Sequence, residues 1–246
     1  MKSSVWVRAL IVTGIVTVAA TMVGLGLWQL RRLQERRALN AEIRQRLAQP
    51  PLTLSGQDLD SPEQLDYRPV VVQGTFDFAN EIVLGNRAYQ GSPGVHVLTP
   101  LRIAGSDVAV LVDRGWIPYM AAAPEARVPY QIPAGEVEIA GILRRSQPRA
   151  SPFLPANPPL SPEQPRLDSW FWVDLNQIQV QMPYPLVPLF VVEAARPDPI
   201  RLPLSGYEVD LSDGPHLSYA FQWFAFAAIA AVGPLVYWRR SRRRKS

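Results

Sequence analysis

Two apolar runs, one near each end of the chain, dominate the pattern of hydrophobic and polar positions. Residues 9–30 and residues 217–238 each contain 22 residues without a charged side chain. A helix that crosses the hydrocarbon core of a bilayer needs about 20 apolar residues at about 1.5 Å rise per residue. Neither run leaves a polar face that would meet water, so both are predicted to be transmembrane helices.

The chain between the two runs has a different pattern. Residues 31–49 are rich in Arg, Leu, Glu, Ala and Gln and contain no Gly or Pro, which predicts a juxtamembrane continuation of the first helix. Residues 50–213 contain short β-branched or alternating segments separated by Gly and Pro, a pattern typical of strands and turns. About seven strands are expected, at residues 70–76, 82–84, 95–103, 108–112, 137–143, 171–173 and 189–192, with a helical turn at residues 174–180.

These elements define the expected fold class. It is a membrane protein in which two transmembrane α-helices flank one mainly antiparallel β (α+β) extracytoplasmic domain. The short connections argue against parallel strands joined by helical crossovers. Residues 148–165 contain seven prolines in 18 residues, which predicts an extended arm without strands of its own. The arm is interpreted as a surface connection, with docking of a partner as the alternative.

Loop charges predict the topology. Residues 239–246 carry six cations in eight residues, which favours a cytoplasmic C-terminus. With two spans, residues 1–8 are then cytoplasmic as well, although Arg31, Arg32, Arg36 and Arg37 lie against the positive-inside rule. A cleaved signal peptide is disfavoured because the apolar run is long and ends in Trp28, Gln29 and arginines. With no amphipathic transit peptide either, the expected location is a bacterial plasma (inner) membrane.

Composition changes the picture in two ways. Residues 48–213 contain 11 Arg, no Lys and 19 acidic residues, which gives this region a net charge of −8. The overall charge of +4 therefore comes from the residues that flank the two apolar runs. Because the central domain is acidic, a nucleic-acid partner is not expected. The chain has no cysteine and two histidines, which excludes disulfides, thiolate metal sites and covalent c-type haem, and leaves too few ligands for zinc.

Enzyme motifs are missing from the sequence. Gly91 and Gly94 are not followed by the lysine and helix of a phosphate-binding loop. No G-x-S-x-G elbow occurs in the sequence either. Asp77 with Glu81, or Asp113 alone, are weak acid–base candidates, since such spacings are common on strands and turns. The chain is therefore expected not to be an enzyme.

The start of the second apolar run is the strongest candidate site. His216, Tyr219 and Trp223 fall on one face of a helix, and Trp28 lies at a similar depth on the first run. An imidazole can ligate haem iron, and aromatic faces can pack on the macrocycle. Arg31 and Arg32 could pair with propionates, and Ala20 with Gly24 offers a small-xxx-small surface for close helix approach. The alternative is an ordinary interfacial belt of aromatic residues.

Two further sites lie in the central domain. His96, between Val95 and Val97, is interpreted as a structural histidine rather than a ligand. Arg114 and Trp116 follow the strand expected at residues 108–112. One interpretation is that the Asp113–Arg114 charge pair ends this strand, and the alternative is that Arg114 and Trp116 form an exposed knob that binds a partner.

A series of short motifs extends over almost the whole chain. The motifs are Gly26-Leu27-Trp28-Gln29 with Arg32, Tyr67-Arg68-Pro69-Val70 with Gly74 and Phe76, Glu81, Asn86-Arg87, Gly91, Pro93-Gly94, Val97-Leu98-Thr99-Pro100-Leu101, Val112-Asp113-Arg114-Gly115-Trp116-Ile117-Pro118, His216-Leu217, Tyr219-Ala220 and Trp223-Phe224. In this order, and between two terminal apolar runs, they resemble the surfeit locus protein 1 family of membrane-bound assembly factors for cytochrome c oxidase.

The resemblance implies a role in oxidase maturation, with transient binding of haem a and its delivery to the catalytic subunit. Partners would be cytochrome c oxidase subunit I, other oxidase assembly factors and the lipid bilayer. His216 matches the proposed iron ligand of the family. Arg36-Arg37 departs from the family's frequent Trp-Lys, which puts the juxtamembrane surface in doubt. The alternative functions are a scaffold that stabilises an assembly intermediate without haem, and an enzyme acting on haem, for which no acid–base constellation is present.

Overall fold

The computed structural model describes residues 2–56, 62–147, 149, 151–198, 200–206 and 209–243. They belong to two compact units. The helical unit contains Met1–Glu42 and Asp210–Ser246, and the barrel unit contains Ile43–Val209.

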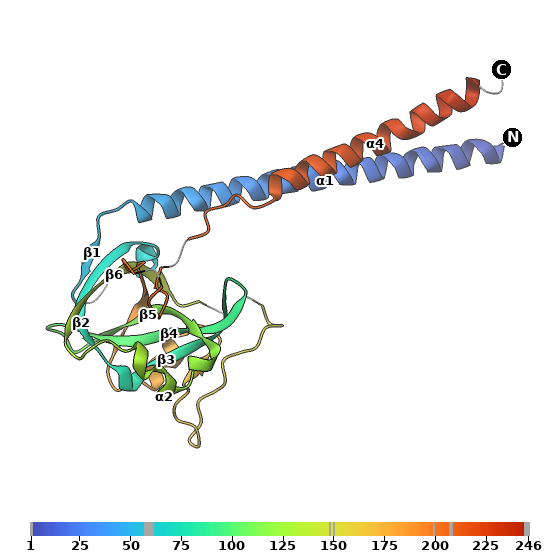
Figure 1. Ribbon diagram of the computed structural model, residues 1–246. Coiled ribbons are helices and arrows are strands. Elements are labelled where there is room, and N and C mark those ends of the chain that lie inside the picture. The colour runs from blue at the N-terminus through green and yellow to red at the C-terminus, as the bar shows by residue number, and fades with distance from the viewer. Residues whose placement is uncertain are drawn as a thin grey trace. The chain divides into compact units, whose positions relative to one another are not determined.

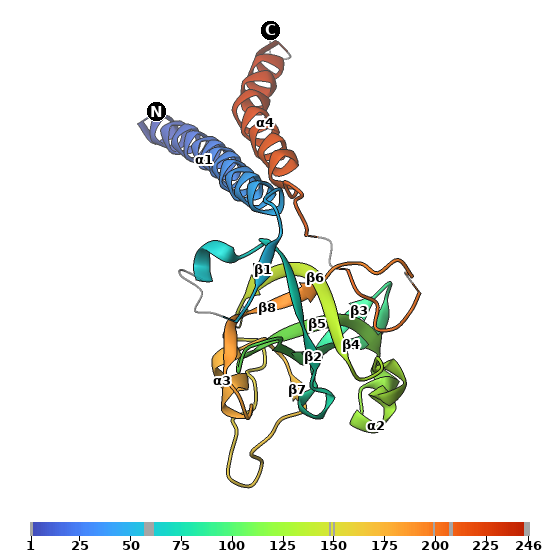
Figure 2. The ribbon, with the colours of Figure 1, turned by 90° about the vertical axis from the view of Figure 1, so that its left-hand side faces the viewer.

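The helical unit consists of two long helices that run side by side (Figure 1). Helix α1 is Lys2–Leu47, of which the part after Glu42 belongs to the barrel unit, and helix α4 is His216–Arg243. The helices diverge towards residues 2 and 243 (Figure 2). Both are long and apolar enough to cross a membrane, by length and composition. Helix α1 passes without a break through residues 9–30 and on to residue 47, so the two helical segments expected there form one rod.

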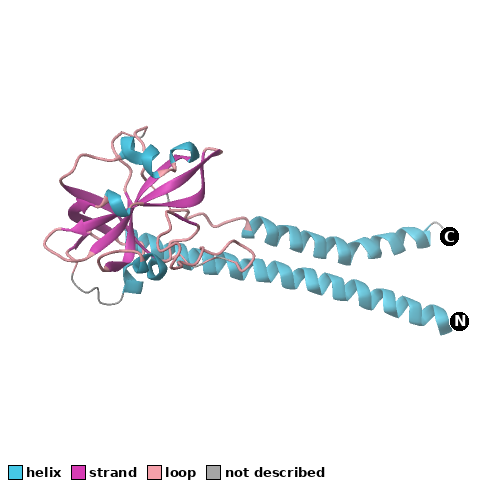
Figure 3. Ribbon diagram, turned by 90° about the horizontal axis from the view of Figure 1, so that it is seen from below, coloured by secondary structure: helices cyan, strands magenta, loops and turns pink. Residues whose placement is uncertain are grey.

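The barrel unit is built on one mixed sheet, drawn in magenta in Figure 3. The strands are β1 (Leu52–Leu54), β2 (Pro69–Phe76), β3 (Ile82–Tyr89), β4 (Ser92–Ile103), β5 (Ala109–Pro118), β6 (Glu136–Arg145), β7 (Ser169–Trp170) and β8 (Leu186–Glu193). The short helices are α2 (Pro124–Arg127) and α3 (Leu175–Val180), and 3₁₀ turns lie at Pro62–Leu65, Phe78–Asn80, Tyr119–Ala121 and Val128–Tyr130.

The sheet closes on itself. Its order is β1-β2-β6-β8-β5-β4-β3-β7, and β2 also pairs with β4, so β2, β6, β8, β5 and β4 form a small barrel. The closing pairs are Gly74↔Ile103, Thr75↔Arg102 and Phe76↔Leu101. Gly74 allows this closure because a Cβ at residue 74 would overlap the carbonyl oxygen of Arg102.

Alternating positions on the strands form two main cores. Every second side chain of a strand points to the same face, so one set of residues fills the barrel and the other covers its outside. The inner core includes Val70, Val72, Leu101, Val110 and Val191 among its members. The outer core is formed by Ile82, Leu84, Leu98, Leu111 and Phe190 with Trp170, Val173 and α3 residues Leu175 and Ile178 packed over them. A smaller cluster is centred on Val83, Val95, Val97 and Ile117.

Most of the predicted strands are confirmed, and the domain is mainly β. The expectation of a strand at residues 171–173 is wrong, since the strand there is Ser169–Trp170 and residues 171–173 form no ladder. The backbone N–H groups of Phe171 and Trp172 instead donate to the Asn157 side chain. Strand β1 was not predicted, because its three residues carry little pattern.

The sheet is mainly antiparallel, as expected, but the argument against parallel strands with crossover connections is wrong. Strands β1 and β2, β3 and β7, and β5 and β8 pair in parallel. The chain between β5 and β8 contains α2, β6, the proline-rich arm and α3, so it is long enough to return to the same end of the sheet. The arm itself contains no strand in its described residues, as expected.

Candidate functional site

The two helices of the helical unit approach closely at one glycine. A Cβ on Gly26 would lie 2.5 Å from Cε1 of Phe224, so only a residue without a side chain lets the ring pack there. Ala220 and Ala227 of α4 are buried, as is Leu33 of α1. Small residues at a helix interface allow such close packing in a lipid environment, where van der Waals contact replaces the hydrophobic effect.

The prediction that the helices approach closely at Ala20 and Gly24 is therefore wrong. Both residues are exposed, and nothing lies within 4 Å of a Cβ placed on Gly24. The approach lies two residues later, because Gly26 faces α4 and Gly24 faces away.

His216 is the first residue of α4 and is joined to α1 by a hydrogen bond. Its Nδ1 lies 2.8 Å from Oε1 of Gln29. Because the amide oxygen can only accept, Nδ1 carries the hydrogen and donates. In the neutral ring, Nε2 then keeps its lone pair, which is the form of histidine that binds a metal. Second-shell acceptors of this kind fix the tautomer and the ring orientation of metal-binding histidines.

The chain that leads into α4 is held by the part of α1 that follows the apolar run. Asn40 is fully buried, and its Nδ2 donates to the carbonyl oxygens of Leu211 at 2.9 Å and Ser212 at 3.1 Å. Arg36 donates to the carbonyl oxygens of Ser212 and Asp210. Arg37 pairs with Asp213 at 2.8 Å. These contacts, which we call the Asn40 clamp, fix where α4 begins and hence where His216 meets Gln29.

The other predicted ligand-binding residues belong to the same two helices. Tyr219 and Trp28 are 46% and 53% exposed, so both rings remain open to a bound molecule or to lipid. Trp223 packs edge-on against Phe226, with ring centroids 6.2 Å apart. Arg31 is exposed, and Arg32 forms an exposed ion pair with Glu35.

Gln29 is a functional candidate that the sequence analysis did not select. The signal was present in the sequence, since Gln29 is a strongly polar side chain inside an uncharged run. A side-chain amide in such a helix usually finds a partner on a neighbouring helix.

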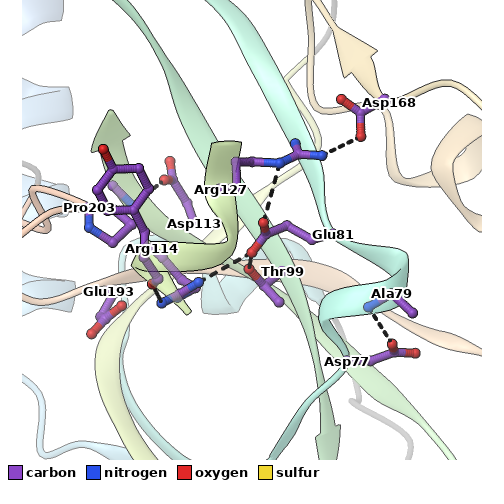
Figure 4. A network of polar contacts seen from close by, with 12 residues as sticks. Asp77, Ala79, Glu81, Thr99, Asp113, Arg114, Arg127, Asp168, Glu193 and Pro203 are labelled. Carbon is purple, nitrogen blue, oxygen red and sulfur yellow. Dashed lines mark hydrogen bonds and ion pairs between the residues drawn. The ribbon is translucent and has the colours of Figure 1, made fainter. Parts of the chain in front are cut away.

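In the barrel unit, family motif residues converge on a buried polar network (Figure 4). Glu81, the residue directly before β3, accepts hydrogen bonds from Thr99 of β4 at 2.6 Å and from Arg114 of β5 at 3.2 Å. Arg127 of α2 lies 3.5 Å from the other Glu81 oxygen and pairs with Asp168. Burial raises the pKa of Glu81, while Thr99 and the two arginines oppose this rise. The network joins strands β4 and β5, helix α2 and the residues that directly precede β3 and β7.

Arg114 makes several further contacts besides its ion pair with Glu81. Its Nη2 donates to the carbonyl oxygen of Tyr130, and its guanidinium lies 5.2 Å from the ring centroids of both Phe76 and Phe78. Burial lowers the pKa of Arg114, although its partner Glu81 raises it. A charge held this way stabilises the fold only while its partners remain, because an unpaired buried charge costs several kcal/mol.

The prediction of an exposed knob at Arg114 and Trp116 is corrected by burial. The two residues are 1% and 7% exposed. The indole of Trp116 packs on Gly94 and lies 5.6 Å from the ring of Tyr89. These side chains therefore support the barrel and do not present a surface to a partner.

The weak acid–base candidates are separated by their partners. Asp77 caps the turn at Phe78–Asn80 and accepts from the hydroxyl of Tyr184 at 2.8 Å. Burial raises the pKa of Asp77, but the hydrogen bonds from Asn80, Tyr184 and Ala79 together lower the pKa by more than burial raises it. The pKa of Asp77 is therefore below its ordinary value. Glu81 belongs to the buried network, and Asp113 pairs with His96. Asp77 and Glu81 thus do not form a pair.

The fold and site together define a class of protein. In the sequence, a small closed barrel lies between two long apolar helices, and these helices pair through a histidine, a glutamine and a glycine. Residues 16–228 match the sequence profile of the SURF1 family, so the chain belongs to that family.

Curated relatives agree with this assignment. The chain is 30% identical over 226 residues to a SURF1-like protein of Monosiga brevicollis, in a match that covers 87% of this chain and 82% of the relative. It is 29% identical to mouse surfeit locus protein 1, over 86% of this chain and 70% of the relative, and 28% identical to the human protein, over 86% and 72%.

Proposed function

We propose that this protein is a membrane-anchored assembly factor for cytochrome c oxidase that holds haem a transiently and passes it to the catalytic subunit. Membership of the SURF1 family supports the role in oxidase assembly. The observation that carries the haem-binding step is the 2.8 Å hydrogen bond between His216 and Gln29. It leaves one imidazole nitrogen of the helical unit ready to accept an iron ion.

In this proposal, helices α1 and α4 both cross a bacterial plasma membrane. Residues 1–8 and 239–246 lie in the cytoplasm, and residues 50–213 lie outside. The six cations at residues 239–246 support this orientation. His216 and Trp28 then lie near the outer boundary of the hydrocarbon layer, where a flat amphiphilic macrocycle is also most soluble.

Each part of the site has a role in this proposal. His216 binds the iron through Nε2, the exposed rings of Trp28 and Tyr219 pack against the macrocycle, and Trp223 supports α4 behind them. Arg31 and Arg32 pair with propionates, since guanidinium groups recognise carboxylates well. A single protein ligand suits a carrier, because the bound molecule must be released to the oxidase. No chemical step is assigned to the protein, which acts as a chaperone and not as an enzyme.

The test uses the two histidines of the chain as matched variants. The full-length protein, His216→Ala and His96→Ala are each purified in detergent from cells that make haem a, and the haem content per chain is measured by optical absorption. We expect His216→Ala to lose most of the haem and His96→Ala to retain it. Equal haem content in the wild type and His216→Ala would reject the ligand assignment.

The second candidate is a scaffold that binds an oxidase assembly intermediate without haem. One observation favours it: Phe153, on the proline-rich arm, is 96% exposed, and exposed aromatic residues are typical of docking surfaces. Co-purification with oxidase subunit I separates the two functions. A scaffold would lose the subunit in Phe153→Ser and keep it in His216→Ala, whereas a haem carrier would show the haem defect in His216→Ala.

A further inference from the structure

The barrel unit contains a second oriented histidine, which the proposed function does not use. Nδ1 of His96 lies 2.9 Å and 3.0 Å from the two carboxylate oxygens of Asp113. One of these oxygens also accepts the backbone N–H of Gly115 at 3.0 Å, which fixes the carboxylate. Because an ionised carboxylate only accepts hydrogen bonds, the hydrogen lies on Nδ1 and His96 has Nε2 left for another partner.

His96 and Asp113 line a pocket of about 220 Å³ on the outer face of the sheet. The floor is apolar and consists of Leu84, Phe190, Val192 and Val173, all of which are buried. The polar side is formed by Arg87, Arg144 and Gln147 together with the His96–Asp113 pair. A pocket below the usual range of about 300–1,000 Å³ for whole drug-sized ligands suits one small group.

The walls of this pocket are held firmly. The backbone N–H of Gln147, two residues after β6, donates to the carbonyl oxygen of Val173 at 2.9 Å. This bond holds together two segments that line the pocket. The guanidinium of Arg144 stacks 4.1 Å from the ring centroid of Tyr67 and donates to Asp66 at 3.2 Å. Side chains that are fixed before binding lose little conformational entropy when a ligand arrives.

The lining favours a small anion that carries an apolar part. The cationic side chains of Arg87 and Arg144 lie on the polar side with His96, while the floor is formed by four apolar side chains. A carboxylate on a short stem matches both sides, because its charge meets the polar groups and its stem covers the floor. Inorganic phosphate has no apolar part, and its second negative charge would lie near the Asp113 carboxylate.

We propose that the pocket lined by His96, Arg87 and Arg144 binds a carboxylate group on a short apolar stem. One carboxylate oxygen accepts from Nε2 of His96 and the other accepts from a guanidinium, while the stem lies on Leu84, Phe190 and Val192. The source of the group is either a free small carboxylic acid or the C-terminal carboxylate of a peptide. This site is independent of His216 and of haem.

The test uses the full-length chain in detergent with ¹⁵N-labelled histidine. The chain has two histidines, so His216→Ala assigns the imidazole signals. Butyrate is titrated against butyramide, which has the same stem without the charge, and against inorganic phosphate. A tripeptide ending in valine, with a free or an amidated C-terminus, tests the second source. We expect a saturable shift of the His96 nitrogen signals with butyrate or the free peptide, and not with their amides.

Arg87→Gln and Arg145→Gln serve as matched variants. Arg145 lies beside Arg144 on β6 but does not line this pocket. Losing one charge-assisted hydrogen bond should make carboxylate binding about tenfold weaker in Arg87→Gln, whereas Arg145→Gln should bind as the wild type does. A response to free peptide alone assigns the site to a protein C-terminus. No saturable shift with any carboxylate, an equal response to the amides or to phosphate, or equal weakening in both variants would overturn the proposal.

Discussion

Gln29 of α1 and His216 of α4 are 187 positions apart in the sequence, and their side chains share a hydrogen bond of 2.8 Å. The bond joins the end of the apolar run within α1 to the first residue of α4. Its consequence for the imidazole is chemical, because the glutamine oxygen decides which ring nitrogen keeps a lone pair.

Removal of the Gln29 acceptor should weaken haem binding without removing the ligand. In Gln29→Met the imidazole loses its fixed tautomer and orientation, and we expect about 10- to 100-fold weaker binding, the usual effect of losing such a partner. Gln29→Glu retains an acceptor oxygen and should bind more tightly than Gln29→Met. Haem titration followed by absorption measures both, with Gln34→Met, an exposed residue of α1, as control. Indistinguishable affinity in Gln29→Met would show that the hydrogen bond has no role.

A side chain at Gly26 should separate the two helices. In Gly26→Val, the added methyl groups must displace the ring of Phe224, and overpacking of this kind typically costs about 1–3 kcal/mol. Gly24→Val is the matched control, since nothing lies within 4 Å of its Cβ. Thermal unfolding in detergent, followed by tryptophan fluorescence, should show a lower Tm for Gly26→Val alone. A similar Tm for the two variants would mean that the helices do not pair through Gly26.

Neutralising Glu81 should destabilise the barrel unit. In Glu81→Gln, the buried guanidinium groups of Arg114 and Arg127 lose their shared negative partner, which costs about 3 kcal/mol or more when a buried ion pair is broken from one side. Glu136 is the exposed first residue of β6, and Glu136→Gln should change the free energy of unfolding by less than about 0.5 kcal/mol. Denaturant unfolding measures both. A Glu81→Gln protein as stable as the wild type would contradict a structural role for the network.

The Asp77 turn predicts a pH dependence of stability. The hydrogen bonds to Asp77 lower the pKa of its carboxyl below the ordinary value of 3.8. The unfolded chain therefore binds this proton more readily, so the stabilisation is fully present above about pH 4 and is lost as the pH falls through the folded-state pKa. Asp77→Asn should cost more stability at pH 7 than at pH 3. Asp107→Asn, in an exposed turn, is the control, and a cost that is constant with pH would disprove the assignment.

The local elements could be predicted from the sequence because their signals are local. The uncharged runs predict α1 and α4, and alternating Val and Leu residues between Gly and Pro turns predict most strands. Closure of the barrel could not be predicted, since the pairing of β2 with β4 depends on Gly74 meeting Arg102 across the sheet. The parallel pair β5–β8 is similarly non-local.

The candidate site divides in the same way. His216 could be selected because it is one of two histidines and begins an apolar run. Its partner could not, because the depth and rotation of α1 relative to α4 depend on the Gly26 contact and the Asn40 clamp. The burial of Arg114 could not be predicted for a related reason: its negative partner Glu81 lies 33 positions earlier, directly before strand β3. A charged residue is usually exposed, and only tertiary structure shows the exception.

The uninterrupted length of α1 has a mechanical consequence. From residue 30 to Asn40 the helix continues for about 15 Å at about 1.5 Å per residue, with no glycine or proline at which it could hinge. A rotation or tilt that a bound molecule imposes near Gln29 is therefore transmitted as torque to Asn40 and to the carbonyl groups that it grips at Leu211 and Ser212. If the protein carries haem as proposed above, loading and unloading would in this way change the contacts at the entrance to α4.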